Sequence, residues 1–358
     1  MIRIKNIKVR AVNIPLEYPV RTAVGVVAVS PLVLIDLETD AGITGSAYLF
    51  AYIPAVLRPL AQTVRELGAM VQNEPLAPVE LARLFDLRLR LIGNTGLLKM
   101  AASGIDMSAW DALAKSMNMP LVTLLGGVTR PVRAYDSHAM DGSNLAAERA
   151  QRAAKAGFKA IKTKIGYATL EEDIAVIAAI RTATEGSVEI MVDYNQSLTV
   201  PEAIRRGRAL VDSGAFWIEE PTLQSDYAGH AMIRAAITAP VQIGENWFGT
   251  DEMVKALDAS ACTFGMVDIM KIGGVTGWLA AAGIAQQRGL PLSSHLFQEF
   301  SAHLLAVTPT ADWLERLDIA GPILEPQLQF VDGMAVMGDA PGAGIIWRED
   351  VIKTYEIE

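Results

Sequence analysis

Apolar and polar residues follow two different patterns along this chain, and the change lies near residue 131. Beyond it, short apolar runs alternate with longer stretches in which apolar residues recur every three or four positions. Short apolar runs predict buried strands, and the longer spacing predicts helices. Eight such units fit a closed parallel barrel better than a doubly wound sheet. The predicted strands are 132–138, 159–165, 188–194, 215–219, 240–245, 264–269, 291–295 and 313–316.

The opening third of the chain has a mixed pattern. Residues 2–14 alternate between apolar and polar, as a half-buried strand does, and a turn-like stretch at 15–31 follows. The apolar run at 32–40 and the segment 41–50 after a glycine turn predict two further strands. The spacing of apolar residues then predicts helices at 54–72, 76–91 and 95–118.

These patterns predict an α/β protein, a modified TIM barrel of the (β/α)7β type with an N-terminal α+β capping domain. The eighth unit is short, and no clear helix follows it. We expect the capping domain at 1–125, the barrel at 126–320 and a C-terminal segment at 321–358 that returns to the capping domain. Strands are expected in that last segment near 325–331 and 343–348.

Acidic residues and a histidine recur where the predicted barrel strands end. The steps between them are 26, 26, 23 and 27 residues, about the length of one strand, one helix and two loops. Active sites of barrel enzymes lie at the C-terminal ends of the strands, so this recurrence predicts the place of the chemistry. The recurring residues are Asp193, Glu219, Glu245, Asp268 and His295.

The first three of these residues predict a metal site. Asp193, Glu219 and Glu245 end successive strands, so their carboxylates would be neighbours and would repel one another strongly. A divalent cation relieves that repulsion, and oxygen ligands with open positions suit Mg²⁺. The alternative is that each carboxylate pairs with a local lysine or arginine.

Two lysines are predicted to face the same site. Lys162 and Lys164 are two residues apart on a predicted strand, so their side chains share a face. Neighbouring ammonium groups lower each other's pKa, which favours a role as general base. Such a pair on a surface strand is usually only solvated, but the flanking residues here are apolar, as in a buried strand.

A histidine, an aspartate and a further glutamate complete the predicted chemistry. Asp268 would hold the tautomer of His295 and raise its basicity from the adjacent strand. Glu315 ends the eighth strand, where a protonated carboxyl group could donate a hydrogen bond to developing negative charge, unless it is a solvated surface residue. Lysine and histidine bases on two sides of a metal could act on opposite faces of one carbon and invert it.

Composition restricts the partners and the compartment. The net charge of −9 and pI near 5.1 argue against nucleic acid and anionic membranes. The single cysteine, Cys262, excludes a disulfide framework and is expected to be buried. The chain shows neither a membrane-length apolar run nor a signal-peptide core, so we expect a cytoplasmic protein. Structural or surface roles are expected for the remaining histidines, His138, His230 and His303.

The motifs along the chain resemble those of the enolase superfamily and, within it, the mandelate racemase subgroup. The capping region carries GIDMSAWDALAK and PLVTLLGG. The barrel carries IKTKIG, MVDYNQ, WIEEP, GENW, DIMKIGG and SSHLFQE, in this order and at the predicted strand ends. The resemblance extends over essentially the whole chain, and its specificity comes from the ordered set of motifs.

The resemblance implies roles for individual residues. Asp193, Glu219 and Glu245 resemble the Mg²⁺ ligands. Lys164 resembles the base for the S enantiomer, and His295, held by Asp268, resembles the base for the R enantiomer. Lys162 resembles the lysine that neutralises the substrate carboxylate, and Glu315 resembles the acid that hydrogen-bonds it. Asn195 and Ser137 stand where the family contacts the substrate.

The resemblance also implies a substrate class, which is mandelate or a close aryl 2-hydroxy acid. A phenyl group fits an apolar wall, whereas a sugar chain would leave buried hydroxyl groups unmatched. Arg21, in the apolar stretch that bears on specificity, departs from a histidine of the subgroup. The residues that resemble the aryl pocket are Val20, Val24, Val27, Phe50, Tyr52, Leu296 and Leu317.

Other functions stay open at this point. Dehydration of an acid sugar would use the same Asp268–His295 pair, with His295 as general acid. A non-catalytic metal- and carboxylate-binding barrel would need no bases on two faces. Muconate-lactonising and dipeptide-epimerising relatives carry a lysine at the position of Asp268, which disfavours those activities. The resemblance further implies a symmetric homo-oligomer, such as an octamer.

Overall fold

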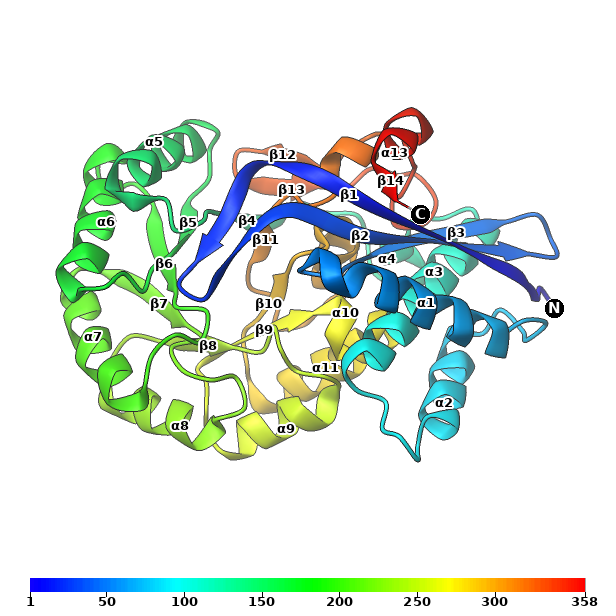
Figure 1. Cartoon of the computed structure of the whole chain (residues 1–358), viewed down its shortest axis with the longest axis horizontal. Coiled ribbons are helices and arrows are strands. Elements are labelled where there is room, and N and C mark those ends of the chain that lie inside the picture. Colours follow the sequence, from blue (N-terminus) through cyan, green and yellow to red (C-terminus); the bar gives the residue numbers. More distant parts are fainter. Residues whose placement is uncertain (358) are drawn as a thin grey trace.

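The computed structural model describes residues 1–357, and the predicted barrel with a capping domain is confirmed (Figure 1). Parallel strands form a curled sheet in the order β10-β9-β8-β7-β6-β5-β4, and β11 pairs with β4. The barrel strands are β4 (Val132–Ser137), β5 (Ala160–Lys164), β6 (Glu189–Asp193), β7 (Ala215–Glu219), β8 (Val241–Ile243), β9 (Phe264–Asp268), β10 (Leu292–His295) and β11 (Leu314–Arg316).

Helices surround this sheet, each following the strand before it. They are α5 (Gly142–Lys155), α6 (Leu170–Ala183), α7 (Val200–Asp212), α8 (Tyr227–Ala236), α9 (Thr250–Asp258), α10 (Ile269–Ile272), α11 (Gly274–Arg288) and α12 (Gln298–Val307). Among residues 1–357, we find no helix with the length and apolar character that a membrane crossing requires.

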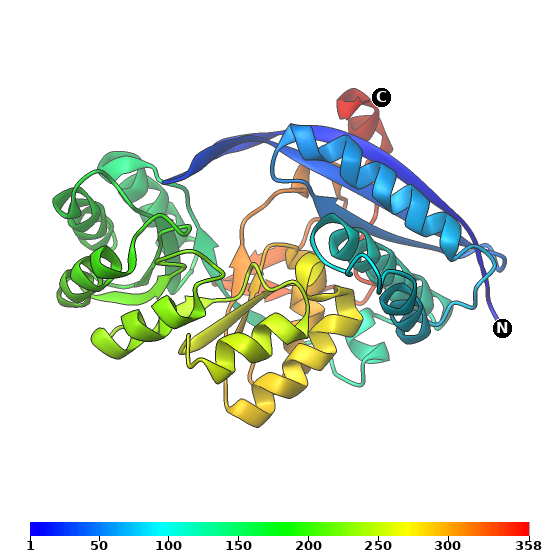
Figure 2. The same cartoon turned by 60° about the horizontal axis from the view of Figure 1, so that its bottom comes forward.

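The capping domain lies against one side of the barrel (Figures 1 and 2). Its sheet has the order β14-β1-β2-β3. Its elements are β1 (Ile4–Thr22), β2 (Gly25–Thr39), β3 (Thr44–Phe50), α1 (Pro54–Met70), α2 (Pro78–Arg88), α3 (Gly96–Ser116) and α4 (Leu121–Leu124). Buried polar contacts join it to the barrel: Asp106 of α3 accepts the Thr276 backbone N–H at 3.0 Å, and Tyr48 donates to Glu299 at 2.6 Å.

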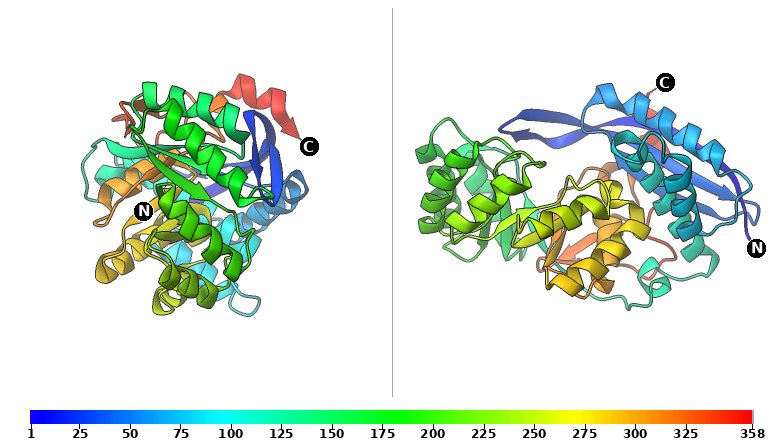
Figure 3. Two further views of the ribbon diagram at one scale, coloured as in Figure 1. Left: turned by 90° about the vertical axis from the view of Figure 1, so that its left-hand side faces the viewer. Right: turned by 90° about the horizontal axis from the view of Figure 1, so that it is seen from below.

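The prediction of a turn at residues 15–31 was wrong. β1 and β2 pair almost to their ends, with an irregularity between Pro15 and Val20, and the turn itself spans only Thr22–Gly25. The valine-rich sequence VGVVAV has high strand propensity, which outweighs the turn signals of the prolines. The result is a long hairpin that arches from the capping sheet over the barrel (Figures 2 and 3).

The C-terminal segment differs in part from its prediction. The expected strand at 325–331 is limited to β12 (Gln329–Val331), which pairs with β13 (Met334–Val336) beside β4 of the barrel. Residues 343–348 form no regular strand: Trp347 makes an isolated antiparallel bridge with Leu324, and the Ala343 N–H donates to Asp111. After α13 (Glu349–Tyr355), β14 (Glu356–Ile357) pairs with β1 of the capping sheet.

The barrel interior is layered by the two-residue period of its strands. One inward layer is apolar and fully packed, and Trp217 lies edge-on to Tyr135 there, with ring centroids 5.7 Å apart. The side chains two residues further along the same strands form the polar layer at the mouth. The apolar layer consists of Tyr135, Ala160, Met191, Trp217, Met266 and Trp313.

The histidines outside the site are structural. His303 is buried in α12 and accepts the Val122 N–H at Nδ1, which ties α4 to the barrel. His230 is buried in α8. His138 is buried next to Asp136, 2.9 Å from its carboxylate. Cys262 is buried, as expected.

We predict that His303 makes stability fall in acid. Burial lowers the pKa of His303 to about 4, so between about pH 6.5 and 4 the unfolded chain binds a proton that the folded chain does not. Stability therefore decreases as pH falls through this window, by up to about 3 kcal/mol. His303→Gln keeps an acceptor for the Val122 N–H and should flatten this dependence, as measured by urea unfolding at pH 7 and pH 5. An unchanged pH dependence in the variant would contradict the assignment.

Candidate active site

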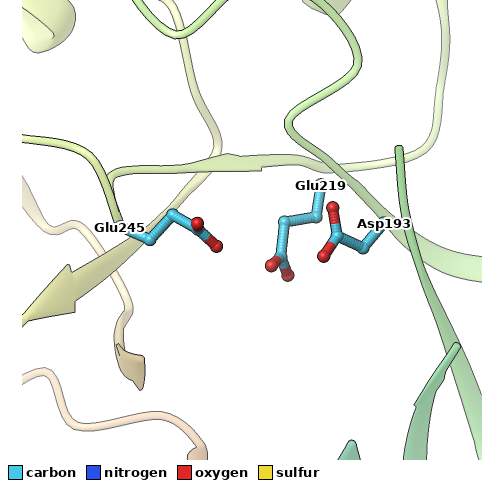
Figure 4. Close-up of side chains that lie close together, drawn as sticks. All are labelled: Asp193, Glu219 and Glu245. Atoms are coloured by element: carbon cyan, nitrogen blue, oxygen red, sulfur yellow. The ribbon is translucent and has the colours of Figure 1, made fainter. Parts of the chain in front are cut away.

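Three carboxylates meet at the C-terminal ends of β6, β7 and β8. Oxygen atoms of Asp193, Glu219 and Glu245 all lie within 4.8 Å of one another, and the three side chains point into a common space (Figure 4). All three residues are buried. The predicted metal-ligand set is thus brought together by neighbouring strands.

The charges of this group fit a divalent cation. Burial is the main cause that raises the pKa of Glu219, and repulsion from neighbouring carboxylates adds to it. The attraction of Lys162 lowers the pKa, and the net result is a pKa of about 7. Such crowding is costly in a low-dielectric interior unless positive charge is added. Carboxylate oxygens are the ligands that Mg²⁺ prefers.

Lys162 is fully buried among these carboxylates. Its ammonium donates to Glu219 Oε1 at 2.6 Å and lies 2.8 Å from Glu315 Oε1. Burial opposes its charge, but Glu219 and Glu315 outweigh burial and raise the pKa of Lys162 well above its usual range. Lys162 therefore binds carboxylates of the protein itself and does not line the cavity described below.

Lys164 lies on the same face, one step closer to the mouth. Its Nζ donates to Asp193 Oδ2 at 2.6 Å. Burial and Lys162 lower the pKa of Lys164, as expected for a lysine pair, but Asp193 outweighs them and the net pKa is raised. The prediction of a net lowering is therefore wrong for this arrangement, because it left out the aspartate.

His295 and Asp268 form the expected pair. The imidazole Nδ1 lies 2.7 Å from Asp268 Oδ2, and Asp268 is itself held by the N–H groups of Met270 and Lys271. A carboxylate accepts only, so Nδ1 carries the proton and Nε2 is left facing Glu245, at 3.5 Å. Burial lowers the pKa of His295, but the surrounding carboxylates, Glu245 first, raise it above its ordinary value.

Glu315 behaves differently from its prediction. Its carboxylate accepts from Ser137 Oγ at 2.8 Å and from the Leu296 N–H at 3.0 Å, besides contacting Lys162. Burial raises the pKa of Glu315, but the lysine and other cations outweigh it and lower the pKa to about 2. Glu315 is therefore an ionised acceptor here, and the expectation of a protonated donor is corrected.

A cavity of about 540 Å³ opens above this polar layer. Lys164, Asn195, Glu245 and His295 line its inner end. Ser137 is not part of this lining; it is buried and donates to Glu315, and its contact with substrate stays a prediction. The predicted apolar wall does line the cavity, through Val20, Val24, Val27, Phe50, Tyr52, Leu296 and Leu317.

Asn195 has one free hydrogen-bonding atom at the cavity. Its Nδ2 donates to Asp193 Oδ2 at 3.0 Å, whereas its Oδ1 is buried without a partner in the described structure. The residue has φ of 44°, in the left-handed region that asparagine tolerates. An acceptor is thus presented to the cavity next to a metal ligand.

Sequence reasoning missed a second layer of polar residues. Lys271 Nζ donates to Asn246 Oδ1 at 2.6 Å, and Asn246 Nδ2 donates to Glu220 Oε1 at 2.7 Å. Gln242 donates to Glu219 at 3.2 Å. Gln242 thus supports the metal ligand Glu219, whereas Lys271, Asn246 and Glu220 form a polar chain that lines the cavity. The adjacent motifs WIEEP, GENW and DIMK contain three of them and could have signalled this layer.

Fold and site together define a magnesium-dependent enzyme of the enolase type. The chain belongs to the mandelate racemase and muconate lactonizing enzyme family of that superfamily. Residues 4–126 match the family's N-terminal domain, and residues 145–351 match the domain described as enolase C-terminal domain-like.

Solved structures and characterised relatives agree with this class. An enolase from Bradyrhizobium complexed with magnesium and mandelic acid has 43% sequence identity and a TM-score of 0.96, covering 100% of this chain and 99% of that one. L-talarate/galactarate dehydratase of Salmonella typhimurium is 31% identical over 274 residues, 74% of this chain and 68% of that protein. D-galactarolactone cycloisomerase of Agrobacterium fabrum is 31% identical over 350 residues, 91% of each.

We predict that Glu245→Gln weakens Mg²⁺ binding more than about 100-fold. Loss of a residue that only hydrogen-bonds a metal ligand already lowers metal affinity roughly 10–100-fold. Isothermal titration with MgCl₂ would measure the affinity without any substrate. Glu189→Gln is the matched control, because Glu189 is exposed at the opposite end of the same strand as Asp193. Equal affinities in the two variants would contradict the assigned ligand set.

Proposed function

We propose that the chain interconverts the R and S enantiomers of mandelate, or of a close aryl 2-hydroxy acid, with Mg²⁺ as cofactor. The observation that carries this proposal is that Lys164 and His295 enter one cavity from β5 and β10, with the carboxylate cluster between them and an apolar wall above. Two bases with a reacting carbon between them suit proton removal on one face and return on the other.

Asp193, Glu219 and Glu245 would hold Mg²⁺, which would supply positive charge to the substrate carboxylate as the α-proton leaves. Lys164 Nζ would take the proton of the S enantiomer as the neutral amine, a form that burial and Lys162 favour once the bond to Asp193 is given up. His295 Nε2 serves the R enantiomer, with Asp268 keeping the proton on Nδ1. Lys162, buried against Glu219 and Glu315, supplies positive charge to this cluster of carboxylates.

The 2-hydroxyl group and the ring have their own places in this scheme. The free Oδ1 of Asn195 accepts the hydroxyl proton, which orients the α-carbon between the bases. The ring lies against the apolar wall, where contact with carbon surface is favourable and no hydroxyl is left unmatched. The mandelic acid bound by the Bradyrhizobium enolase supports this substrate class.

Dehydration of an acid sugar is the second candidate, because the dehydratase of Salmonella typhimurium is a relative of this chain. The same groups would serve, with His295 as the acid that protonates the departing hydroxyl. The apolar wall disfavours it, since a polyol chain would bury several hydroxyl groups there without partners. Release of a 2-keto acid from an aldonate or aldarate would favour this second function.

We predict metal-dependent exchange of the α-proton of both (R)- and (S)-mandelate in D₂O, followed by NMR and abolished by excess EDTA. Lys164→Ala should slow exchange from S by roughly 10²–10⁴-fold, and His295→Asn should do the same for R, as expected for loss of a general base. Lys159 is an exposed lysine just before β5, the strand that carries Lys164, so Lys159→Ala should leave both exchanges unchanged.

The pattern across variants is decisive for the two-base assignment. If Lys164→Ala and His295→Asn each lost both exchanges equally, the assignment of one base to each face would be wrong. Absence of exchange with every 2-hydroxy acid tested would instead favour a barrel that binds metal and carboxylates without catalysis.

A further inference from the structure

The outer wall of the cavity is made by the end of the long β1–β2 hairpin. We call residues 16–27 the roof hairpin. Its base belongs to the capping sheet, and its tip reaches the side of the barrel that carries β5 and α5 (Figures 1 and 2). The residues with which it lines the cavity are Leu16, Val20, Thr22, Val24, Gly25, Val26 and Val27.

The roof hairpin is only weakly attached to its own sheet. The ladder between β1 and β2 is interrupted after Pro15 and resumes at Val20. Beyond this break, the pairs Val20–Val27, Arg21–Val26 and Thr22–Gly25 join the two arms to each other. A break in the ladder is a natural point for bending, so the position of the roof hairpin depends on what its tip contacts.

Tyr18 lies within this break and is held by two arginines of the barrel. The guanidinium carbon of Arg149 lies 4.7 Å from the centroid of the Tyr18 ring, and that of Arg152 lies 5.6 Å from it. Arg152 Nη2 also donates to the Tyr18 hydroxyl at 3.1 Å. Both arginines are on α5, three residues apart, so they share one face of the helix.

This arrangement is rigid on the barrel side. Arg149 donates to Asp141 Oδ2 at 2.6 Å, and the Asp141 side chain is completely buried. The half-buried guanidinium of Arg149 is therefore held in place by Asp141. Its contact with the aromatic face of Tyr18 then costs little side-chain freedom.

The tip of the roof hairpin makes two further contacts with the same side of the barrel. The Met140 N–H donates to the Arg21 carbonyl at 2.9 Å. Ala23 lies against Gly166, where an added Cβ would be 2.8 Å from the Ala23 Cβ. Gly166 follows Lys164 by two residues, so the roof closes beside the proposed base.

We propose that Tyr18, gripped by Arg149 and Arg152, is a positioning residue that holds the roof hairpin closed over the aryl end of the substrate. Tyr18 does not line the cavity and acts only through Leu16 and the valines of the roof hairpin. The substrate part of this proposal rests on the proposed function. The closure itself does not, because it is a property of the free protein.

Tyr18→Leu should raise KM for mandelate by roughly tenfold, because it removes two cation–π contacts that together correspond to about one power of ten, and Arg152→Met, which removes one of them, should raise KM by about threefold. kcat should change less than about threefold, since the roof contacts the ring and not the reacting carbon, and uniform binding acts on KM. Tyr18→Phe keeps the ring between the arginines and should retain nearly all of the wild-type affinity. Lys155→Met is the control for charge, because Lys155 is on α5 and bonds Gln151.

Hydrogen exchange of the roof hairpin tests closure without turnover. Backbone amides of residues 20–27 should exchange several-fold faster in Tyr18→Leu than in the wild type or in Lys155→Met, while Mg²⁺ affinity stays the same. Equal exchange in all three proteins would overturn the proposal, even in an enzyme that turned out to act on another substrate. A matching loss of kcat and Mg²⁺ affinity would also overturn it, because it would show general damage to the barrel.

Discussion

The site depends on confining several carboxylates at one edge of the barrel. Asp193, Glu219, Glu245 and Glu315 converge there, and Lys162 and Lys164 are the ammonium groups that contact them. The carboxylates outnumber these ammonium groups, and the excess of negative charge favours a bound cation. The same imbalance that makes the arrangement costly for the folded chain therefore makes it selective for a divalent cation.

An apolar layer of the barrel lies directly beneath these charged groups. Several site residues follow a packed apolar residue by two positions, as Glu219 follows Trp217 and Asp193 follows Met191. Water cannot reach the carboxylates from below, so their interactions with lysine are stronger than they would be at a surface. Core packing and site electrostatics are thus set by alternate residues of the same strands.

The barrel and its site could be predicted because both rest on local periodicity. Recurrence of an acid or a base after each apolar run identifies a strand end without knowledge of the partners. Protonation states could not be predicted in this way. The pKa of Lys164 and of Glu315 depends on Asp193 and Lys162, which come from other strands and whose distances only the fold supplies.

The backbone structure of the roof hairpin could not be predicted from the local sequence either. Prolines and a glycine at 15–31 predict turns, but pairing between distant residues of β1 and β2 decides the outcome. Ser137 is an example for side chains. The sequence alone does not distinguish a serine exposed at a strand end from one buried against Glu315.

In the proposed function, catalysis and substrate choice come from different parts of this molecule. The groups proposed to exchange protons come from barrel strands, like the metal ligands, whereas Val20, Val24 and Phe50 of the wall come from the capping domain. A change in the hairpin therefore alters the wall without moving a carboxylate. This separation explains how a family with one set of acid–base groups includes relatives named for dehydration and for cycloisomerisation. For this chain, it makes the valines of the roof hairpin the strongest argument for an aryl substrate, because a barrel of this kind would serve either chemistry equally well.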